Sequence, residues 1–441
     1  MATPSIPDVP PLSVLKVNST RFASLRGANL LERTTPFSTD FWQPRLTHDV
    51  LPYRRTVHGD VSPRVRVSGM QGDAWSGVSF TAQDYLGLSR DPSVRNAVQE
   101  ALHCYGPHAG SSPMLAGVTP LSEQLEEALA ALTGMPHVVL FPTGWAAGFG
   151  AITGLVRSRD HVVLDSRAHA CLQAGARAAT AQVAIAAHLD NASVREKLAE
   201  IRSTDTSNAI MVVTEGLYSM DADSPDLREL QDICHEFEAV LLVDMAHDLG
   251  ALGPGGTGQA GVQGMWGKLD LVMGSFSKCF ATNGGFVATR SREVAQYMRM
   301  FTSSHFFSSA LSPLQAAAAL QCARIVTSNE GEQRRQQLGE ASDHFRKALA
   351  NRGHTVVGER SAIVPVDCGT QEAGRLACRL AEQRGLVLAL VEFPAVARGT
   401  ARFRMQLMYD HDLRDLDTAA DIVHDCLAGA ERQIHDLQVA K

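Results

Sequence analysis

Lys278 lies in a segment of small and hydroxyl-bearing residues, "GSFSKCFATNGG" (274–285). These neighbours leave little bulk and no second cation around its amine. A lysine in a cramped, cation-poor pocket can lose its proton near neutral pH and attack a carbonyl carbon. The segment therefore predicts a lysine that forms a Schiff base. Cys279, the next residue, is interpreted as a small filler rather than as a reactive thiol.

Further polar groups follow the ends of short apolar runs, which are predicted to be strands. The runs span 137–141, 161–165, 209–215, 239–245 and 269–275. The residues at or just after their ends are Gly144 and Trp145, His169, Ser219, Asp244 and His247, and Ser275 and Ser277. Ligands of open α/β sheets bind beyond the carboxyl ends of the strands. Any one of these residues is more often a cap or a satisfied polar group, but their convergence at one edge predicts a site.

Pyridoxal 5′-phosphate (PLP) is a compound that would use every member of this set. Its aldehyde would bind Lys278. Its phosphate would bind the backbone N–H groups at the helix start around 144–145, with hydroxyl donors from Ser275 and Ser277. The small residues around the lysine would leave room for a substrate to displace it.

The remaining members would act on the cofactor ring. Asp244 would keep the pyridine nitrogen protonated, which makes the ring an electron sink. His169 could stack on the ring, and His247 could donate a hydrogen bond to the phenolic oxygen. The sequence therefore predicts PLP as the cofactor, and no metal site is expected.

The elements that must position these groups alternate between strand and helix. The strands are continuous apolar runs, as in a mostly parallel sheet that is covered on both faces. Residues 1–75, rich in Pro, Arg and Ser, are predicted to be an N-terminal arm, and 76–310 a large α/β domain. Residues 311–441 are predicted to hold a connector helix and a small C-terminal α+β domain.

Composition excludes several other classes of protein. The net charge is −7 and no Lys/Arg block occurs, which argues against a nucleic-acid partner. No run approaches the length of a spanning helix, and the N-terminus is unlike a secretory signal, so no membrane partner is expected. The eight cysteines are scattered singly, which is typical of reduced thiols in a cytoplasmic protein.

Five motifs occur in an order that resembles the α-oxoamine synthase family. They are "AQDYLGLS" (82–89), "VVTEGLYSMDADSPDL" (212–227), "LLVDMAH" (241–247), the lysine segment and "GTARFRMQL" (399–407). The resemblance runs from about 75 to 430. It implies the fold type I architecture of aspartate-aminotransferase-like PLP enzymes and a homodimer with shared active sites.

The resemblance also implies a reaction. An amino acid would lose a bond at its α-carbon, and the resulting carbanion would attack an acyl thioester carried by coenzyme A or by an acyl-carrier protein. Loss of CO₂ would give an α-amino ketone. Other PLP reactions, such as aminotransfer and β- or γ-elimination or replacement, use the same cofactor residues and stay open.

Family roles transfer to named positions. Lys278, Asp244, His169 and His247 resemble the catalytic, cofactor-binding residues described above. Ser219 would lie near the phenolic oxygen, while Gly144, Trp145 and Ser275 would bind the phosphate. Ser308 or Ser309 would reach the phosphate from the second subunit. Arg404, in preference to Arg402, would bind the amino-acid carboxylate.

Three departures from the family pattern affect the substrate side. Met245 replaces an acidic residue after the ring-binding aspartate, and Gln83 replaces an asparagine expected near the substrate carboxylate. The segment "YGPHAGSSPMLAG" (105–117) replaces a glycine-rich segment. These changes favour a member of specialised metabolism with an unusual electrophile, which need not be a thioester.

A second motif suggests another class of enzyme. "GTGQAG" (256–261) matches the G-x-G-x-x-G fingerprint of dinucleotide-binding proteins. It does not directly follow a predicted strand, and no helix is predicted to receive a phosphate there. A loop is therefore favoured over an NAD-binding oxidoreductase, in which Lys278 would have no role. A non-catalytic scaffold is disfavoured because both the lysine and the aspartate are present.

Overall fold

The computed structural model describes residues 9–70, 72 and 74–439, and its contacts divide the chain into two compact units. The central unit comprises Gln83–Gly339 and Met408–Asp410. The N/C unit combines the chain up to Ala82 with Glu340–Leu407 and the chain from His411 onward. In this division the N-terminal segment groups with the C-terminal region. The predicted connector helix, α13 (Pro313–Val326), groups with the central unit.

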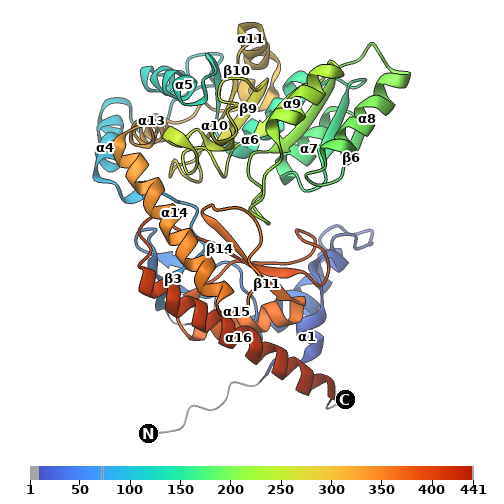
Figure 1. Ribbon diagram of the computed structural model, residues 1–441, viewed down its shortest axis with the longest axis vertical. Helices are drawn as coiled ribbons and strands as arrows, with labels where there is room; N and C mark the ends of the chain where they lie inside the picture. The colour runs from blue at the N-terminus through green and yellow to red at the C-terminus, as the bar shows by residue number, and fades with distance from the viewer. Residues whose placement is uncertain (1–8, 71, 73, 440–441) are drawn as a thin grey trace. The chain divides into compact units, whose positions relative to one another are not determined.

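The central unit contains a seven-stranded sheet in the order β4-β10-β9-β8-β7-β5-β6 (Figure 1). Its strands are β4 (His137–Phe141), β5 (His161–Asp165), β6 (Val183–Ala186), β7 (Ile210–Glu215), β8 (Val240–Asp244), β9 (Leu271–Ser275) and β10 (Gly285–Thr289). Only β10 runs antiparallel to its neighbours β4 and β9. The mostly parallel α/β fold predicted from the sequence is confirmed.

The helices of the central unit are α4 (Pro92–Tyr105), α5 (Pro120–Thr133), α6 (Gly144–Leu155), α7 (Ala170–Ala179), α8 (Asn191–Thr204), α9 (Leu227–Glu236), α10 (Gly258–Val262), α11 (Arg292–Phe301), α12 (Ser303–Phe306) and α13. The long helix α14 (Asn329–Ala350) begins in this unit and continues into the N/C unit. Hydroxyl caps define several starts, because a side-chain oxygen satisfies an otherwise unpaired N–H group. Thr143 caps α6 in this way, and Ser312 forms a capping box with Gln315 at α13.

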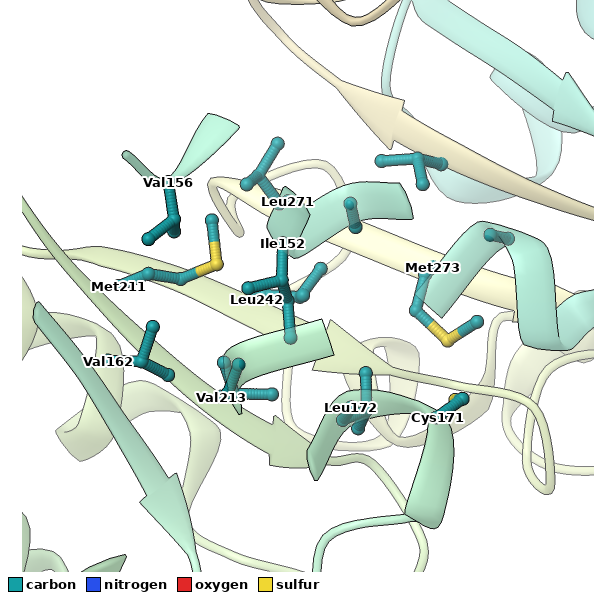
Figure 2. Packing of buried hydrophobic residues seen from close by; sticks show 14 of the residues in the cluster. Ile152, Val156, Val162, Cys171, Leu172, Met211, Val213, Leu242, Leu271 and Met273 are labelled. Carbon is teal, nitrogen blue, oxygen red and sulfur yellow. The ribbon is translucent and has the colours of Figure 1, made fainter. Parts of the chain in front are cut away.

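The core of the central unit lies between the sheet and helices α6 and α7. Figure 2 shows Ile152 of α6 and Leu172 of α7 among strand residues that include Met211, Val213 and Leu242. The alternate strand residues are also buried, which explains the continuous apolar runs. The strands are therefore held firmly from both faces.

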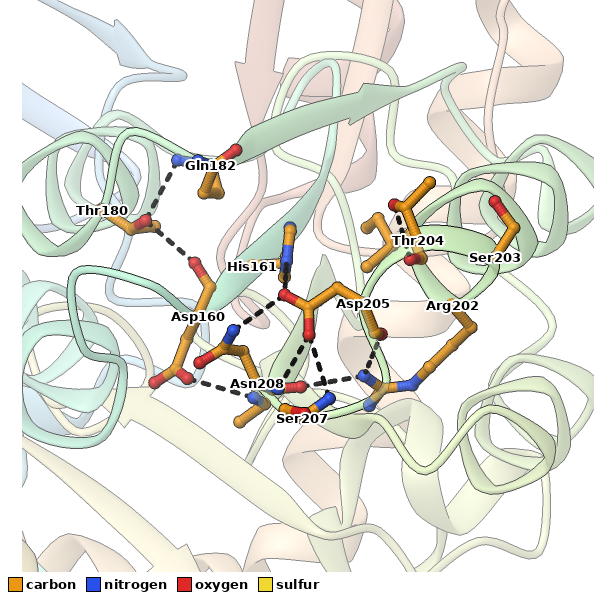
Figure 3. A network of polar contacts seen from close by, with 12 residues as sticks. Asp160, His161, Thr180, Gln182, Arg202, Ser203, Thr204, Asp205, Ser207 and Asn208 are labelled. Atoms are coloured by element: carbon orange, nitrogen blue, oxygen red, sulfur yellow. Dashed lines mark hydrogen bonds and ion pairs between the residues drawn. The ribbon is translucent and has the colours of Figure 1, made fainter.

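A polar network fixes the amino ends of β5 and β7, at the edge opposite to the predicted site (Figure 3). His161 and Asn208 both contact the carboxylate of Asp205, at 2.9 and 2.8 Å. Asp160 accepts a hydrogen bond from the backbone N–H of Ala209 at 3.0 Å. These polar groups bind one another, so they hold the chain at this edge of the sheet.

The N/C unit contains two small sheets. One has the order β1-β2-β3-β12 and the other β11-β14-β13. Their strands are β1 (Thr56–His58), β2 (Arg64–Ser68), β3 (Trp75–Ser79), β11 (Ile363–Gly369), β12 (Leu386–Val387), β13 (Leu390–Val391) and β14 (Ala401–Gln406). The helices are α1 (Leu12–Lys16), α2 (Thr35–Phe37), α3 (Gln43–Thr47), α15 (Gln371–Gln383) and α16 (Leu413–Val439).

Buried charges attach the N-terminal segment within the N/C unit. Arg375 forms an ion pair with Glu392 at 2.7 Å, and both side chains are almost inaccessible to solvent. The same guanidinium donates hydrogen bonds to the backbone carbonyls of Leu15 and Val17. Among the described residues, no helix is long and apolar enough to span a membrane.

Candidate active site

The structure brings several predicted groups to one edge of the central sheet. Strands β7, β8 and β9 are parallel neighbours, and the register pairs Glu215 with Asp244 and Asp244 with Met273. Asp244 and Ser275 end their strands, and the turn carrying Lys278 follows β9. The carboxyl ends of parallel strands meet at the same edge, as the sequence predicted.

A hydrogen-bonded turn presents Lys278. The backbone N–H of Ala281 donates to the Lys278 carbonyl at 3.0 Å, and that of Thr282 donates to the Phe276 carbonyl at 3.0 Å. Ala281 has a φ of 51°, in the left-handed region. Lys278 is half-buried, whereas Cys279 beside it is fully buried, where desolvation raises the pKa of its thiol. The interpretation of Cys279 as a filler agrees with this burial.

Asp244 is a buried carboxyl group whose pKa is subject to opposing effects. Burial raises its pKa, while the charges of Lys278 and His169 and the backbone N–H of Ala246 oppose that rise. The Ala246 N–H donates to Oδ1 of Asp244 at 2.9 Å. A cation placed beside this carboxylate would be strongly favoured, since the site lies away from water.

His247 is held by a residue that the sequence analysis did not single out. Its Nδ1 lies 2.9 Å from Oη of Tyr85, and both side chains are buried. Tyr85 belongs to the "AQDYLGLS" motif, so the signal was present but no role followed from it. The contact fixes the orientation of the imidazole ring.

His169 caps the start of α7 and leaves its ring exposed. Its Nδ1 accepts a hydrogen bond from the backbone N–H of Cys171 at 3.3 Å. The Trp145 ring packs edge-on against it, with ring centroids 6.0 Å apart. An exposed flat ring in a fixed orientation can stack on a planar ligand.

The start of α6 approaches the end of β9 closely. A Cβ atom on Gly144 would lie 2.2 Å from Oγ of Ser275, so only glycine fits there. Ser275 and Ser277 share a hydrogen bond at 2.8 Å. Two hydroxyl groups therefore adjoin the N-terminal end of a helix, where backbone N–H groups favour an anion.

The remaining predicted residues are divided between the two units. Ser219 is buried in the turn after β7. Ser308 and Ser309 lie in the loop between α12 and α13 and are half-buried and exposed, respectively. Gln83 is half-buried, and its backbone carbonyl accepts the N–H of Tyr85 at 2.9 Å. Arg404 lies on β14 of the N/C unit.

The "GTGQAG" segment has a structure that leaves little opportunity for a dinucleotide. A short helix, α10, does begin within it, which the sequence analysis did not anticipate. However, a 3₁₀ turn at Pro254–Gly256 precedes this helix, rather than a strand. The N–H groups of Gly258 and Gln259 already donate to the Leu252 carbonyl and to Oδ2 of Asp248.

Comparisons with known proteins identify the family. The model of aminotransferase classes I and II matches residues 76–423. The 8-amino-7-oxononanoate synthase of Salmonella arizonae is 34% identical over 392 residues, which cover 87% of this chain and 98% of the relative. The chain belongs to the α-oxoamine synthase family. Its members are PLP-dependent transferases that form a carbon–carbon bond, and the chain is an enzyme of this kind.

Solved structures agree with this assignment. A serine palmitoyltransferase from S. paucimobilis, solved with a bound PLP–myriocin adduct, has a TM-score of 0.85 and 26% identity, covering 91% of this chain and 99% of that one. An 8-amino-7-oxononanoate synthase from Francisella tularensis has a TM-score of 0.65 and 21% identity and covers 79% and 97% of the two chains, a likeness of fold alone. The fold type I architecture expected of an α-oxoamine synthase is confirmed.

Proposed function

We propose that this α-oxoamine synthase binds PLP through Lys278 and Asp244 and joins an amino acid to an acyl thioester. The supporting observation is the placement of the two residues. Asp244 ends β8 and Lys278 follows β9, the adjacent parallel strand, at one sheet edge. The positive charge of Lys278 lowers the pKa of Asp244 and so favours its carboxylate form. When bound, PLP supplies an electron sink that stabilises the carbanion formed at the substrate's α-carbon.

Each proposed residue has a defined task. Lys278 would bind the cofactor's aldehyde, and its amine would move a proton at the substrate's α-carbon. Asp244 would hold the proton on the ring nitrogen. His169 would stack on the ring, and His247, oriented by Tyr85, would donate to the phenolic oxygen together with Ser219.

The phosphate is proposed to bind at the start of α6. The fit is supported by the close approach of Gly144 to Ser275 and by the paired hydroxyl groups of Ser275 and Ser277. Trp145 continues the helix start with a half-exposed side chain. Backbone N–H groups and hydroxyl groups together satisfy the oxygen atoms of a dianion.

We also propose a homodimer. Leu115 is 78% exposed and Phe307 is 84% exposed in the single chain, although both are large and apolar. Phe307 directly precedes Ser308 and Ser309, which are proposed to reach the partner's phosphate.

The eight cysteines are free thiols, which fits a reducing compartment such as the cytoplasm.

The substrate assignment is tested with purified enzyme loaded with PLP. Single amino acids are combined with acyl-coenzyme A thioesters or acylated carrier protein, and released thiol and CO₂ are measured. Thiol release that requires both an amino acid and a thioester supports the proposal. Thiol release without any amino acid contradicts it, and release of a β- or γ-substituent from the amino acid alone favours elimination.

A further inference from the structure

Glu215 is a buried acid that the proposed reaction leaves without a role. It ends β7, only 4% of it is exposed, and the register places it directly beside Asp244 of β8. Neighbouring strands lie about 4.8 Å apart, and registered residues of parallel strands face the same side of a sheet. The two carboxyl groups are therefore lateral neighbours at the proposed cofactor site.

The surroundings of Glu215 connect it to two proposed cofactor contacts. Its carboxyl group accepts a hydrogen bond from the backbone N–H of His169, the residue proposed to stack on the ring. On its other side lies Asp244, proposed to face the ring nitrogen. Glu215 thus lies between the residue proposed to fix the face of the ring and the one proposed to fix its charge.

The charges nearby do not allow both carboxyl groups to ionise. Burial raises the pKa of Glu215 well above its usual range, and the charges of Asp244 and Asp165 raise it further. The His169 N–H and the positive charge of Lys278 oppose this rise only in part. Asp244 experiences the charges of both Lys278 and His169. A single negative charge on the pair therefore belongs on Asp244.

A neutral acid at position 215 would satisfy both neighbours. Its carbonyl oxygen still accepts the His169 N–H, and without a charge it does not oppose ionisation of Asp244. An ionised Glu215 would instead repel Asp244.

We propose that Glu215 is a positioning residue that acts as a neutral acid, supporting His169 through its backbone and keeping Asp244 the one ionised carboxyl at the ring nitrogen. The inference rests on the proposed site of PLP. It predicts that an uncharged isostere preserves the site, whereas removal of the side chain does not.

The test compares Glu215→Gln with Glu215→Ala in the full chain. Each apoprotein is titrated with PLP to give a Kd, and the visible absorbance of the bound cofactor is recorded. Glutamine keeps an acceptor and a donor without charge, so its Kd and absorbance maximum should match the wild-type values, to about threefold for the Kd. Alanine removes the acceptor of the His169 N–H and should weaken binding about tenfold or more. Glu236→Gln, on an exposed pair with Arg195, is the control and should bind PLP as the wild type does.

Two outcomes would overturn the proposal. One is that Glu215→Gln weakens binding as much as Glu215→Ala, which would mean that a charge is required; the other is that Glu215→Ala binds PLP normally. If the alanine variant does not fold, a tenfold loss in Glu215→Gln alone contradicts the proposal, and wild-type affinity supports it. The PLP affinities of the wild type and of Lys278→Ala are measured alongside. Equal affinities of these two proteins would show that the proposed cofactor site itself is wrong.

Discussion

Arg402 and Arg404 lie two residues apart on β14, so they share one face of the strand and form a matched pair for testing substrate recognition. Both are half-buried. In its proposed role, Arg404 binds the amino-acid carboxylate through two parallel hydrogen bonds, which an ammonium cannot reproduce, so Arg404→Lys should raise the KM for the amino acid about tenfold or more. Arg402→Lys should leave that KM nearly unchanged. Steady-state kinetics with varied amino acid measure both, and a larger effect at Arg402 would reverse the assignment.

His188 gives a pH dependence that is independent of catalysis. Burial disfavours its charged form, but hydrogen bonds with Asp165 at 2.9 Å and Asp223 at 3.2 Å outweigh this and raise its pKa to about 9. The pKa of an unfolded histidine is about 6.5. This contribution to stability is therefore fully present below about pH 6.5 and is lost as the pH rises through 9.

The prediction concerns the free energy of unfolding between pH 6 and 10. After allowance for solvent screening, the protonated ring should contribute about 1 kcal/mol at the acidic end. Denaturant titrations of wild type and His188→Gln at several pH values measure it, and the difference between the two curves should shrink with rising pH. Parallel curves would show that His188 does not titrate as described.

At the residue level, sequence reasoning found Lys278 from the small residues around it. It found Asp244 and His247 from their places at and just after the end of an apolar run. Glu215 ended such a run as well, yet a charged residue at a strand end is ordinarily solvated. Its proposed role depends on register with Asp244, which only the folded sheet defines.

Among the elements, the junction between α6 and β9 offers a sharp steric test. Gly144→Ala would drive a Cβ atom into Ser275, at 2.2 Å from Oγ and 2.5 Å from Cβ, and should cost about 1–3 kcal/mol of stability. Gly144→Ala with Ser275→Gly removes both atoms and should recover much of that loss. Thermal unfolding of the apoproteins measures both.

The control is a glycine in open space. An added Cβ atom on Gly429 in α16 would lie 3.8 Å from its nearest neighbour, Cδ1 of Leu380, so Gly429→Ala should be neutral or stabilising by up to about 1 kcal/mol. If Gly144→Ala behaved like Gly429→Ala, the close approach of α6 to β9 would be contradicted.

The elements of the central unit were largely predictable, since apolar runs buried on both faces are easily recognised. The strands expected at 137–141 and 161–165 match β4 and β5 exactly in their bounds. Strand β10 was not predicted; it begins at Gly285, the last residue of the lysine segment. The continuous apolar run 386–391 divides into β12 and β13, which pair in different sheets. That division depends on tertiary partners and has no signal in the run itself.

For the whole molecule, the proposed dimer makes a measurable prediction. Phe307→Asp places a charge on the proposed interface and should shift the wild-type dimer toward monomer in sedimentation velocity, with weaker PLP binding. Ile185→Asp replaces another exposed apolar side chain, on the edge strand β6, and should leave the dimer intact. A wild-type monomer that binds PLP tightly would contradict the shared site.

The central claim is that Lys278 is the residue that binds PLP covalently. The chain has six lysines, so the attachment point can be assigned without ambiguity. PLP-loaded enzyme is reduced with borohydride, digested and mapped by mass spectrometry, with Lys268→Ala as a control for general lysine labelling. The account predicts stoichiometric modification of Lys278 in both proteins. Modification at another lysine, or none after attempted loading with PLP, would contradict it.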